Sequence, residues 1–184
     1  MKECDAALAA DPHNVRFRSC GSTFQFAGQY ERAVEYLRLD AGTNWQKERE
    51  AEVRLLQGRR EEAARLFEAT GDNEDAAFGR YLLKTDSPAE RDAVAAKLAA
   101  DAAADPDPEG KFHAAAFLCG PGYTKAGLTV LGDAVSHGFL AYEAMDRNPL
   151  FDSVRKEPEF IAIREEAIRK QKDFVARRDA PPGA

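Results

Sequence analysis

The feature that most constrains the fold of this chain is a recurrence of small residues and turn signals about every thirty residues. The small residues are Ala33, Ala63, Ala93 and Ala126. The turn-forming residues Gly28, Gly58 and Pro88 each stand five positions before one of the first three alanines. A small side chain lets one helix approach another closely, and glycine or proline permits a sharp reversal between them. Each period therefore predicts a helix, a tight turn and a second helix.

A single helical hairpin cannot bury its apolar face alone, so such units stack into arrays. The periodicity predicts four hairpins, at residues 14–40, 44–70, 73–104 and 111–137. Prolines at two helix starts indicate that residues 148–178 cap the array. The chain carries 34 Ala and 14 Leu against 8 Val and 3 Ile, which favours helices over strands. We therefore expect an all-α fold, with one repeat domain over residues 1–178 and a disordered tail over 179–184.

Residues 14–47 resemble one unit of the tetratricopeptide repeat family. The matching positions are the large residue Phe17, the small residues Gly21 and Ala33, the aromatic Phe24 and the turn glycine Gly28. The phrase Ala-Asp-Pro-His-Asn at 10–14 is similar to the family's link between repeats, which implies that residues 3–10 are the second half of an earlier repeat. The resemblance covers about residues 3–140 and implies a right-handed solenoid of stacked antiparallel hairpins. The capping segment resembles the end of many bacterial tetratricopeptide regions.

The resemblance also implies where a partner binds. In this family the first helices of successive repeats line a concave face that holds an extended peptide or a helix. On this chain the corresponding positions are Arg18, Ser22, Gln25, Gln29, Trp45, Glu48 and Glu52. Some family members bind a terminal carboxylate there with Lys, Asn and Arg, but Ser22 stands where that Asn is expected and Glu48 where a positive group is needed. We therefore expect no carboxylate clamp, and Trp45 is either an exposed anchor for the partner or a residue packed between repeats.

We expect a non-enzymatic module that binds a protein or peptide, either as a scaffold or adaptor or as the partner-binding segment of a larger bacterial regulatory protein. His13, His113 and His137 show no metal-binding spacing, and no phosphate loop or activated nucleophile is visible, so no catalytic residue, metal or cofactor is expected. The alternative is an enzyme or small-ligand protein with a site between repeats, for which Cys119, His113 and Tyr123 are the candidates. Self-association through the concave face is a third hypothesis.

Charge and hydropathy exclude several classes of partner. With 26 Lys+Arg against 32 Asp+Glu the net charge is -6, so nucleic-acid binding is not expected. No run approaches the ~20 apolar residues that span a bilayer, and the first residues lack the apolar core of a secretory signal, so we expect no membrane insertion and a cytoplasmic location. Cys4, Cys20 and Cys119 are odd in number, far apart and outside any Cys-x-x-Cys pattern, which indicates free thiols rather than a disulfide framework or a zinc site.

The last predicted helix is rich in basic residues and has two interpretations. The basic residues are Arg164, Arg169, Lys170, Lys172, Arg177 and Arg178. They form either a contact patch for an acidic partner or a solvated face whose positive charges complement the dipole at the helix end. Because Glu165, Glu166 and Asp173 interrupt the basic residues, the sequence favours the solvated face.

Overall fold

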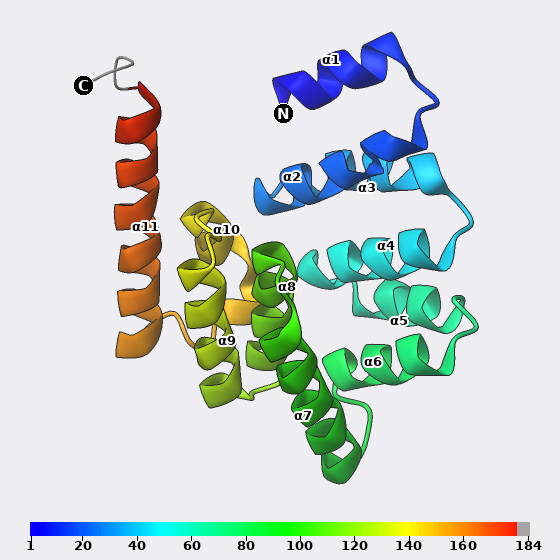
Figure 1. The fold of residues 1–184 in the computed structure, drawn as a ribbon. Coiled ribbons are helices and arrows are strands. Elements are labelled where there is room, and N and C mark those ends of the chain that lie inside the picture. The colour runs from blue at the N-terminus through cyan, green and yellow to red at the C-terminus, as the bar shows by residue number, and fades with distance from the viewer. Residues whose placement is uncertain (180–184) are drawn as a thin grey trace. The chain divides into compact units, whose positions relative to one another are not determined.

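The computed structural model describes residues 1–179, apart from the side chains of residues 73 and 74. Every regular element in this part of the chain is a helix, which confirms the predicted all-α class (Figure 1). The order begins α1 (Lys2–Ala10), η1 (Val15–Ser19), α2 (Cys20–Phe26), α3 (Tyr30–Leu37), η2 (Arg38–Asp40), α4 (Asn44–Leu56), α5 (Arg60–Glu68) and α6 (Asn73–Leu83). It continues with α7 (Pro88–Ala104), α8 (Pro108–Cys119), α9 (Thr124–Ser136), α10 (Tyr142–Arg147), η3 (Pro149–Phe151) and α11 (Pro158–Asp179). Of the predicted tail, residue 179 ends α11 and residues 180–184 lie outside the described residues.

The chain divides into two compact units, Met1–Val94 and Ala95–Ala184, with the boundary inside α7. The sequence predicted a single repeat domain, so this division differs from the expectation. The predicted hairpin at 73–104 falls across the boundary, and the other three predicted hairpins each lie within one unit.

The first unit contains two hairpins, α2–α3 and α4–α5, whose turns have the same geometry thirty residues apart. Gly28 and Gly58 have φ angles of 73° and 75°, a left-handed conformation that glycine adopts without a steric penalty. In each turn the N–H of the residue after the glycine donates to the carbonyl oxygen five positions earlier, over 2.8 Å. Both are Schellman turns, in which backbone groups left unpaired at the helix end are satisfied. The prediction that these two glycines mark the reversals is confirmed.

The small residues of the first two periods lie where paired helices cross. Ala33 and Ala63 are fully buried. Across the α2–α3 crossing, Gly21 approaches so closely that a Cβ atom on it would lie 2.8 Å from the side chain of Leu37. The side chains of this hairpin form a hydrophobic cluster in which the rings of Phe24 and Tyr36 stack at 5.0 Å. The predicted close approach of the two helices is therefore present in this pair.

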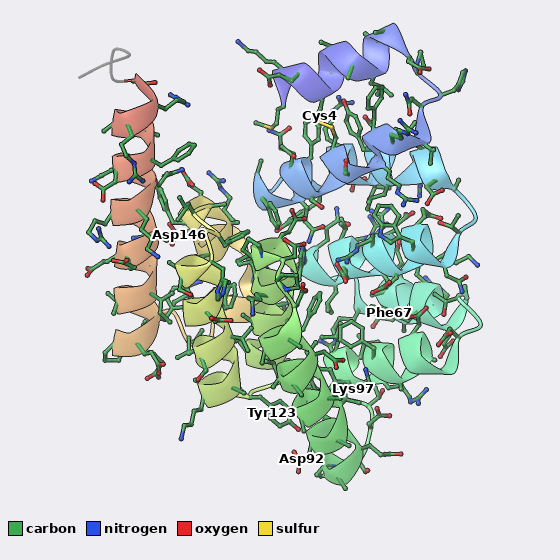
Figure 2. All side chains as sticks on the ribbon, viewed as in Figure 1. Cys4, Phe67, Asp92, Lys97, Tyr123 and Asp146 are labelled. Carbon is green, nitrogen blue, oxygen red and sulfur yellow. A yellow bond between two sulfur atoms is a disulfide. The ribbon has the colours of Figure 1, made fainter. Side chains whose placement is uncertain are left out.

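The third period departs from the pattern. Ala93, predicted to pack at a helix crossing, is exposed, so that prediction was wrong. The left-handed residue after α6 is Lys84, with a φ angle of 59°, although the expected turn signal was Pro88. α6 packs against α5, where the rings of Phe67 and Phe78 meet edge to face at 6.0 Å (Figure 2). Because the chain turns four residues earlier than expected, Ala93 does not take the place that Ala33 has in the first period.

Cys4 of α1 and Cys20 of α2 form a disulfide, with their Cα atoms 6.0 Å apart (Figure 2). The sequence indicated free thiols, and this indication was wrong for these two residues. No residue of α1 is fully buried, and the helix is held beside the α2–α3 pair by a few side chains. Asp5 accepts hydrogen bonds from the guanidinium of Arg32 and, over 2.9 Å, from the hydroxyl of Tyr36. The pairing depends on α1 folding back, which the spacing of the cysteines does not reveal.

An ion network centred on the buried Glu50 of α4 reaches Arg38 of η2 in the first unit. Glu50 is buried and accepts hydrogen bonds from Arg38 and Gln46, each over 2.7 Å, and from Arg54 over 2.9 Å. Arg54 is buried as well. Because a buried charge is tolerated only when it is paired and hydrogen-bonded, this network restricts how η2 and α4 can pack.

The second unit is built around the α8–α9 hairpin, the most extensive helix contact in the described chain. The small residue at the crossing is Gly127, whose hypothetical Cβ would lie 3.0 Å from the carbonyl oxygen of Ala115. The sequence had assigned this role to its neighbour Ala126, which is only half-buried, so the prediction was off by one residue. α11 packs on α9 and α10, and its Phe160 lies against Phe151 of η3 with ring centroids 5.6 Å apart.

Candidate functional site

Arg18, Asp40 and Trp45 form a cluster where η1, η2 and the start of α4 meet in the first unit. The guanidinium of Arg18 lies over the Trp45 ring, 4.3 Å from its centroid, and ion-pairs with Asp40. Asp40 also accepts a 3.0 Å hydrogen bond from the hydroxyl of Thr43, whose oxygen caps α4 by accepting from the N–H of Gln46. Trp45 is half-buried and packs against the hydrophobic cluster of α2 and α3. One portion of the Trp45 surface therefore packs between helices and another is accessible, and its role as an anchor for a partner stays a prediction.

Glu48 and Glu52 lie one turn apart on the same side of α4, close to Asp75 of α6. Glu48 is half-buried, and no side chain that the structure describes donates a hydrogen bond to its carboxylate. Burial, followed by the carboxylates of Glu52 and Asp75, raises the pKa of Glu48 to about 7, although Arg49 acts in the opposite direction. Arg49 itself ion-pairs with Glu52 over 3.0 Å. Among the described residues, Glu48 is therefore a partly desolvated carboxyl group that forms no ion pair, and the nearby charge of Arg49 is paired with Glu52.

The remaining predicted contact residues do not all face solvent. Gln25 and Glu52 were predicted to contact a partner on the concave face, but both side chains are buried within the first unit. Ser22 is half-buried, and Gln29 is exposed. Gln29 lines a hollow of about 380 Å³ beside the first Schellman turn, at the other end of α2 from Arg18.

The second unit has a cavity of about 730 Å³ along α7 and α9. Small side chains of α7 form one wall, and Tyr123 and Val130 contribute to the other. Asp133 lies at one end, where the buried ammonium of Lys111 donates to it over 2.6 Å and to the carbonyl oxygen of Ala102 over 2.8 Å. The Lys111 hydrogen bond lowers the pKa of Asp133 below its usual value. The carboxylate in this cavity is therefore already paired within the protein.

The candidate residues of the alternative site differ in their surroundings. Cys119 is fully buried at the end of α8, against Gly127 of α9. Burial raises the pKa of its thiol to about 12, so at neutral pH the nucleophilic thiolate is not formed. His113 is buried among aromatic rings of α8, with its Nε2 atom 3.9 Å from the carboxylate of Glu109. Of the three candidates only Tyr123 lines the cavity of the second unit.

Sequence reasoning missed the charged residues that complete these clusters. Asp40 and Arg18 are 22 positions apart, as are Lys111 and Asp133. No local motif joins such pairs, because the tertiary packing alone brings them together. The one local signal was Thr43, a residue type that favours the N-cap of a helix.

Within residues 1–179, no group of three or more His, Cys, Asp or Glu side chains is placed to hold a metal ion. None of the helices in this range combines the length and the apolar character needed to cross a membrane. Comparisons of the chain with protein-family models, with curated proteins and with solved structures found no match.

Proposed function

We propose that this protein is a non-enzymatic interaction module of the tetratricopeptide type, acting as a scaffold, an adaptor or the partner-binding part of a larger regulatory protein. The two hairpins α2–α3 and α4–α5 support this proposal, because their turns repeat the same geometry after thirty residues. In the proposal the hairpins stack as a right-handed array. Their first helices then present side chains to an extended peptide or a helix.

The observation that carries the proposal is the carboxyl group of Glu48, which forms no ion pair with any side chain that the structure describes. A desolvated carboxyl without a cation has a raised pKa, and a positive charge brought by a ligand stabilises its ionised form. Trp45 lies one turn earlier on α4 and offers an accessible aromatic surface. We infer that the partner segment carries a Lys or Arg that meets Glu48 and an apolar residue that meets Trp45.

The intrinsic fluorescence of Trp45 tests this proposal, because Trp45 is the single tryptophan of the chain. The probes are two pools of twelve-residue peptides that share a central apolar residue and differ in having Lys or Glu three positions away from it. The Lys pool should change the Trp45 emission and bind more tightly at pH 8 than at pH 5.5, since Glu48 is ionised only at the higher pH. The Glu48→Gln variant should weaken binding about tenfold, which corresponds to about 1.4 kcal/mol.

The matched control is Glu61→Gln, which neutralises an exposed glutamate on α5, the second helix of the same hairpin. This variant should bind the Lys pool as the wild type does. Equal binding of the two pools, or unchanged affinity in Glu48→Gln, refutes the proposed site.

A site near Cys119 is the alternative function, and the cavity lined by Tyr123 is the observation in its favour. Iodoacetamide alkylation discriminates between the two. We expect Cys119 to react only after the protein unfolds, because its thiol is buried and its pKa is raised. Rapid alkylation of the native protein at pH 7 is the result that favours the alternative.

The cellular location is also part of the proposal. The expectation of a cytoplasmic location depended on the lack of a secretory signal in the first residues, and the Cys4–Cys20 disulfide argues against a reducing compartment. Disulfides persist in oxidising compartments, so we propose that the protein works in one of them. Thiol labelling of the protein taken directly from its source cells tests this, with one labelled cysteine expected and three contradicting the proposal.

A further inference from the structure

Helix α11 uses one face to dock within its own unit. On this face Phe160 and Ala167 are buried. The guanidinium of Arg164 reaches the carboxylate of Asp146 on α10 through two hydrogen bonds of 2.6 Å (Figure 2). Lys170 donates to a backbone carbonyl oxygen at the end of α9 over 3.2 Å. The contacts that hold α11 therefore come from a single side of the helix.

A second apolar stripe runs along α11 next to this docking face. It consists of Ile161, Ile168 and Val175, which are spaced by seven residues, or about two helical turns. Ile161 is 44% exposed and Val175 is 37% exposed, while Ile168 is half-buried. Phe174, beside the end of the stripe, is 53% exposed. An apolar repeat of seven residues is typical of a helix that packs against another helix.

The charges of α11 fit a second copy of the same helix in the opposite direction. Three of the four charged residues in its first half are glutamates, namely Glu159, Glu165 and Glu166. Its second half holds five basic residues against two aspartates. Antiparallel pairing therefore places the acidic half of each helix beside the basic half of the other, which is the arrangement of complementary potentials found at specific interfaces.

One pair of residues defines the register of this arrangement. Glu165 and Lys172 border the stripe on the same side, are exposed, and form no ion pair with another residue of the described chain. Glu165 precedes Ile168 by three residues, and Lys172 follows it by four. If two antiparallel helices cross at Ile168, Glu165 of one copy and Lys172 of the other lie within about 1.5 Å of each other along the helix axis.

We propose that the protein self-associates through α11, with the stripe of Ile161, Ile168 and Val175 packed against the same stripe of a second copy in antiparallel orientation. Ile168 lies at the two-fold axis, and Ile161 of each copy faces Val175 of the other. Two symmetric Glu165–Lys172 ion pairs lie along one edge of the apolar contact, on either side of the two-fold axis. A contact of two single helices buries less than about 1,200 Å², so the dimer is weak and depends on concentration. The peptide site of the first unit takes no part in this interface.

Sedimentation equilibrium tests the proposal over protein concentrations from about 1 μM to about 1 mM. The mass of the wild type should rise from 20.2 kDa towards twice that value. Val175→Asp should abolish the rise, because it places a charge in the stripe. Ala176→Asp, at an exposed position one residue further along and outside the stripe, should leave it unchanged. A monomer at every concentration, or a dimer that persists in Val175→Asp, overturns the proposal.

A charge exchange tests the antiparallel register. Glu165→Lys and Lys172→Glu should each remain monomeric, because each brings like charges together across the two-fold axis. An equimolar mixture of the two variants should form the dimer, since every cross-pair is then complementary. Far-ultraviolet circular dichroism should show wild-type helicity for both variants, because the substituted side chains are exposed. Full dimerisation of either single variant alone, or no dimer in the mixture, overturns the register.

Discussion

Removing the Cys4–Cys20 disulfide should loosen α1 without unfolding the rest of the first unit. The bond closes a loop over 16 residues of sequence, and the chain-entropy relation assigns about 3 kcal/mol to a loop of that size. Without the bond, α1 is a helix of nine residues with no fully buried side chain. Helices this short are marginal in water. The reduced α1 is therefore held mainly by the contacts of Asp5 and by partial packing of Leu8.

Hydrogen exchange followed by mass spectrometry measures this effect in each segment. We expect the amides of α1 to lose up to about two orders of magnitude of protection in Cys4→Ser, because each factor of ten corresponds to about 1.4 kcal/mol. The amides of α4 and α5 should keep their wild-type protection. Cys20→Ser should give the same result as Cys4→Ser, since either substitution removes the same bond.

A thiol count establishes the state of the starting material. The denatured, unreduced wild type should show one free thiol, that of Cys119. Unchanged protection of α1 after the bond is removed refutes the reasoning, because α1 would then be held by its non-covalent contacts alone. An equal loss of protection in α4 and α5 also refutes it, because the two regions would then unfold together.

Three further substitutions have defined consequences. Glu50→Ala removes the nearest carboxylate of the buried Arg54, which keeps only the more distant Glu31 and Glu62, and should lower the free energy of unfolding by up to about 3–5 kcal/mol. The measurement is the urea midpoint, and no change in it contradicts a structural role for the network. Lys84→Gly places glycine at a left-handed backbone position that is strained for lysine, and it should raise the free energy of unfolding by about 0.5–1 kcal/mol in the same assay. A lower free energy of unfolding in this variant contradicts the left-handed conformation of residue 84. The pKa of Glu48 is about 7 in the folded chain, against a usual value of 4.5. Between pH 4.5 and pH 7 the folded chain therefore keeps a proton on Glu48 that the unfolded chain releases. As a result, the contribution of Glu48 to the free energy of unfolding falls as the pH rises through this window. Glu48→Gln should remove that slope and stabilise the protein by about 1–2 kcal/mol at pH 8, after allowance for solvent screening; parallel pH profiles of variant and wild type contradict the assignment.

Features that depend on a few neighbouring residues could be predicted from the sequence. The turns at Gly28 and Gly58 follow from a glycine between two helical stretches, because glycine adopts the left-handed conformation at little cost. The burial of Ala33 and Ala63 follows from their fixed distance to those turns. The third turn could not be placed in this way, since its left-handed residue is Lys84, a residue type that gives no turn signal.

The candidate site could be predicted only in part for a similar reason. Helical spacing placed Trp45 and Glu48 on one side of α4, and both retain accessible surface. The same spacing placed Gln25 and Glu52 facing outward, but both are buried. Spacing fixes which residues share a face of a helix, and the neighbouring helices decide how much of that face remains open.

The sequence by itself determined the helical class, the first two turns and the small residues at their helix crossings, because periodicity and turn chemistry act within a few residues. The tertiary structure alone decided the Cys4–Cys20 disulfide, the division of the chain within α7 and the pairing of Arg18 with Asp40. These features join residues that are distant in sequence or depend on how whole helices pack. Their energies arise only when those helices meet, so no local pattern of residues encodes them.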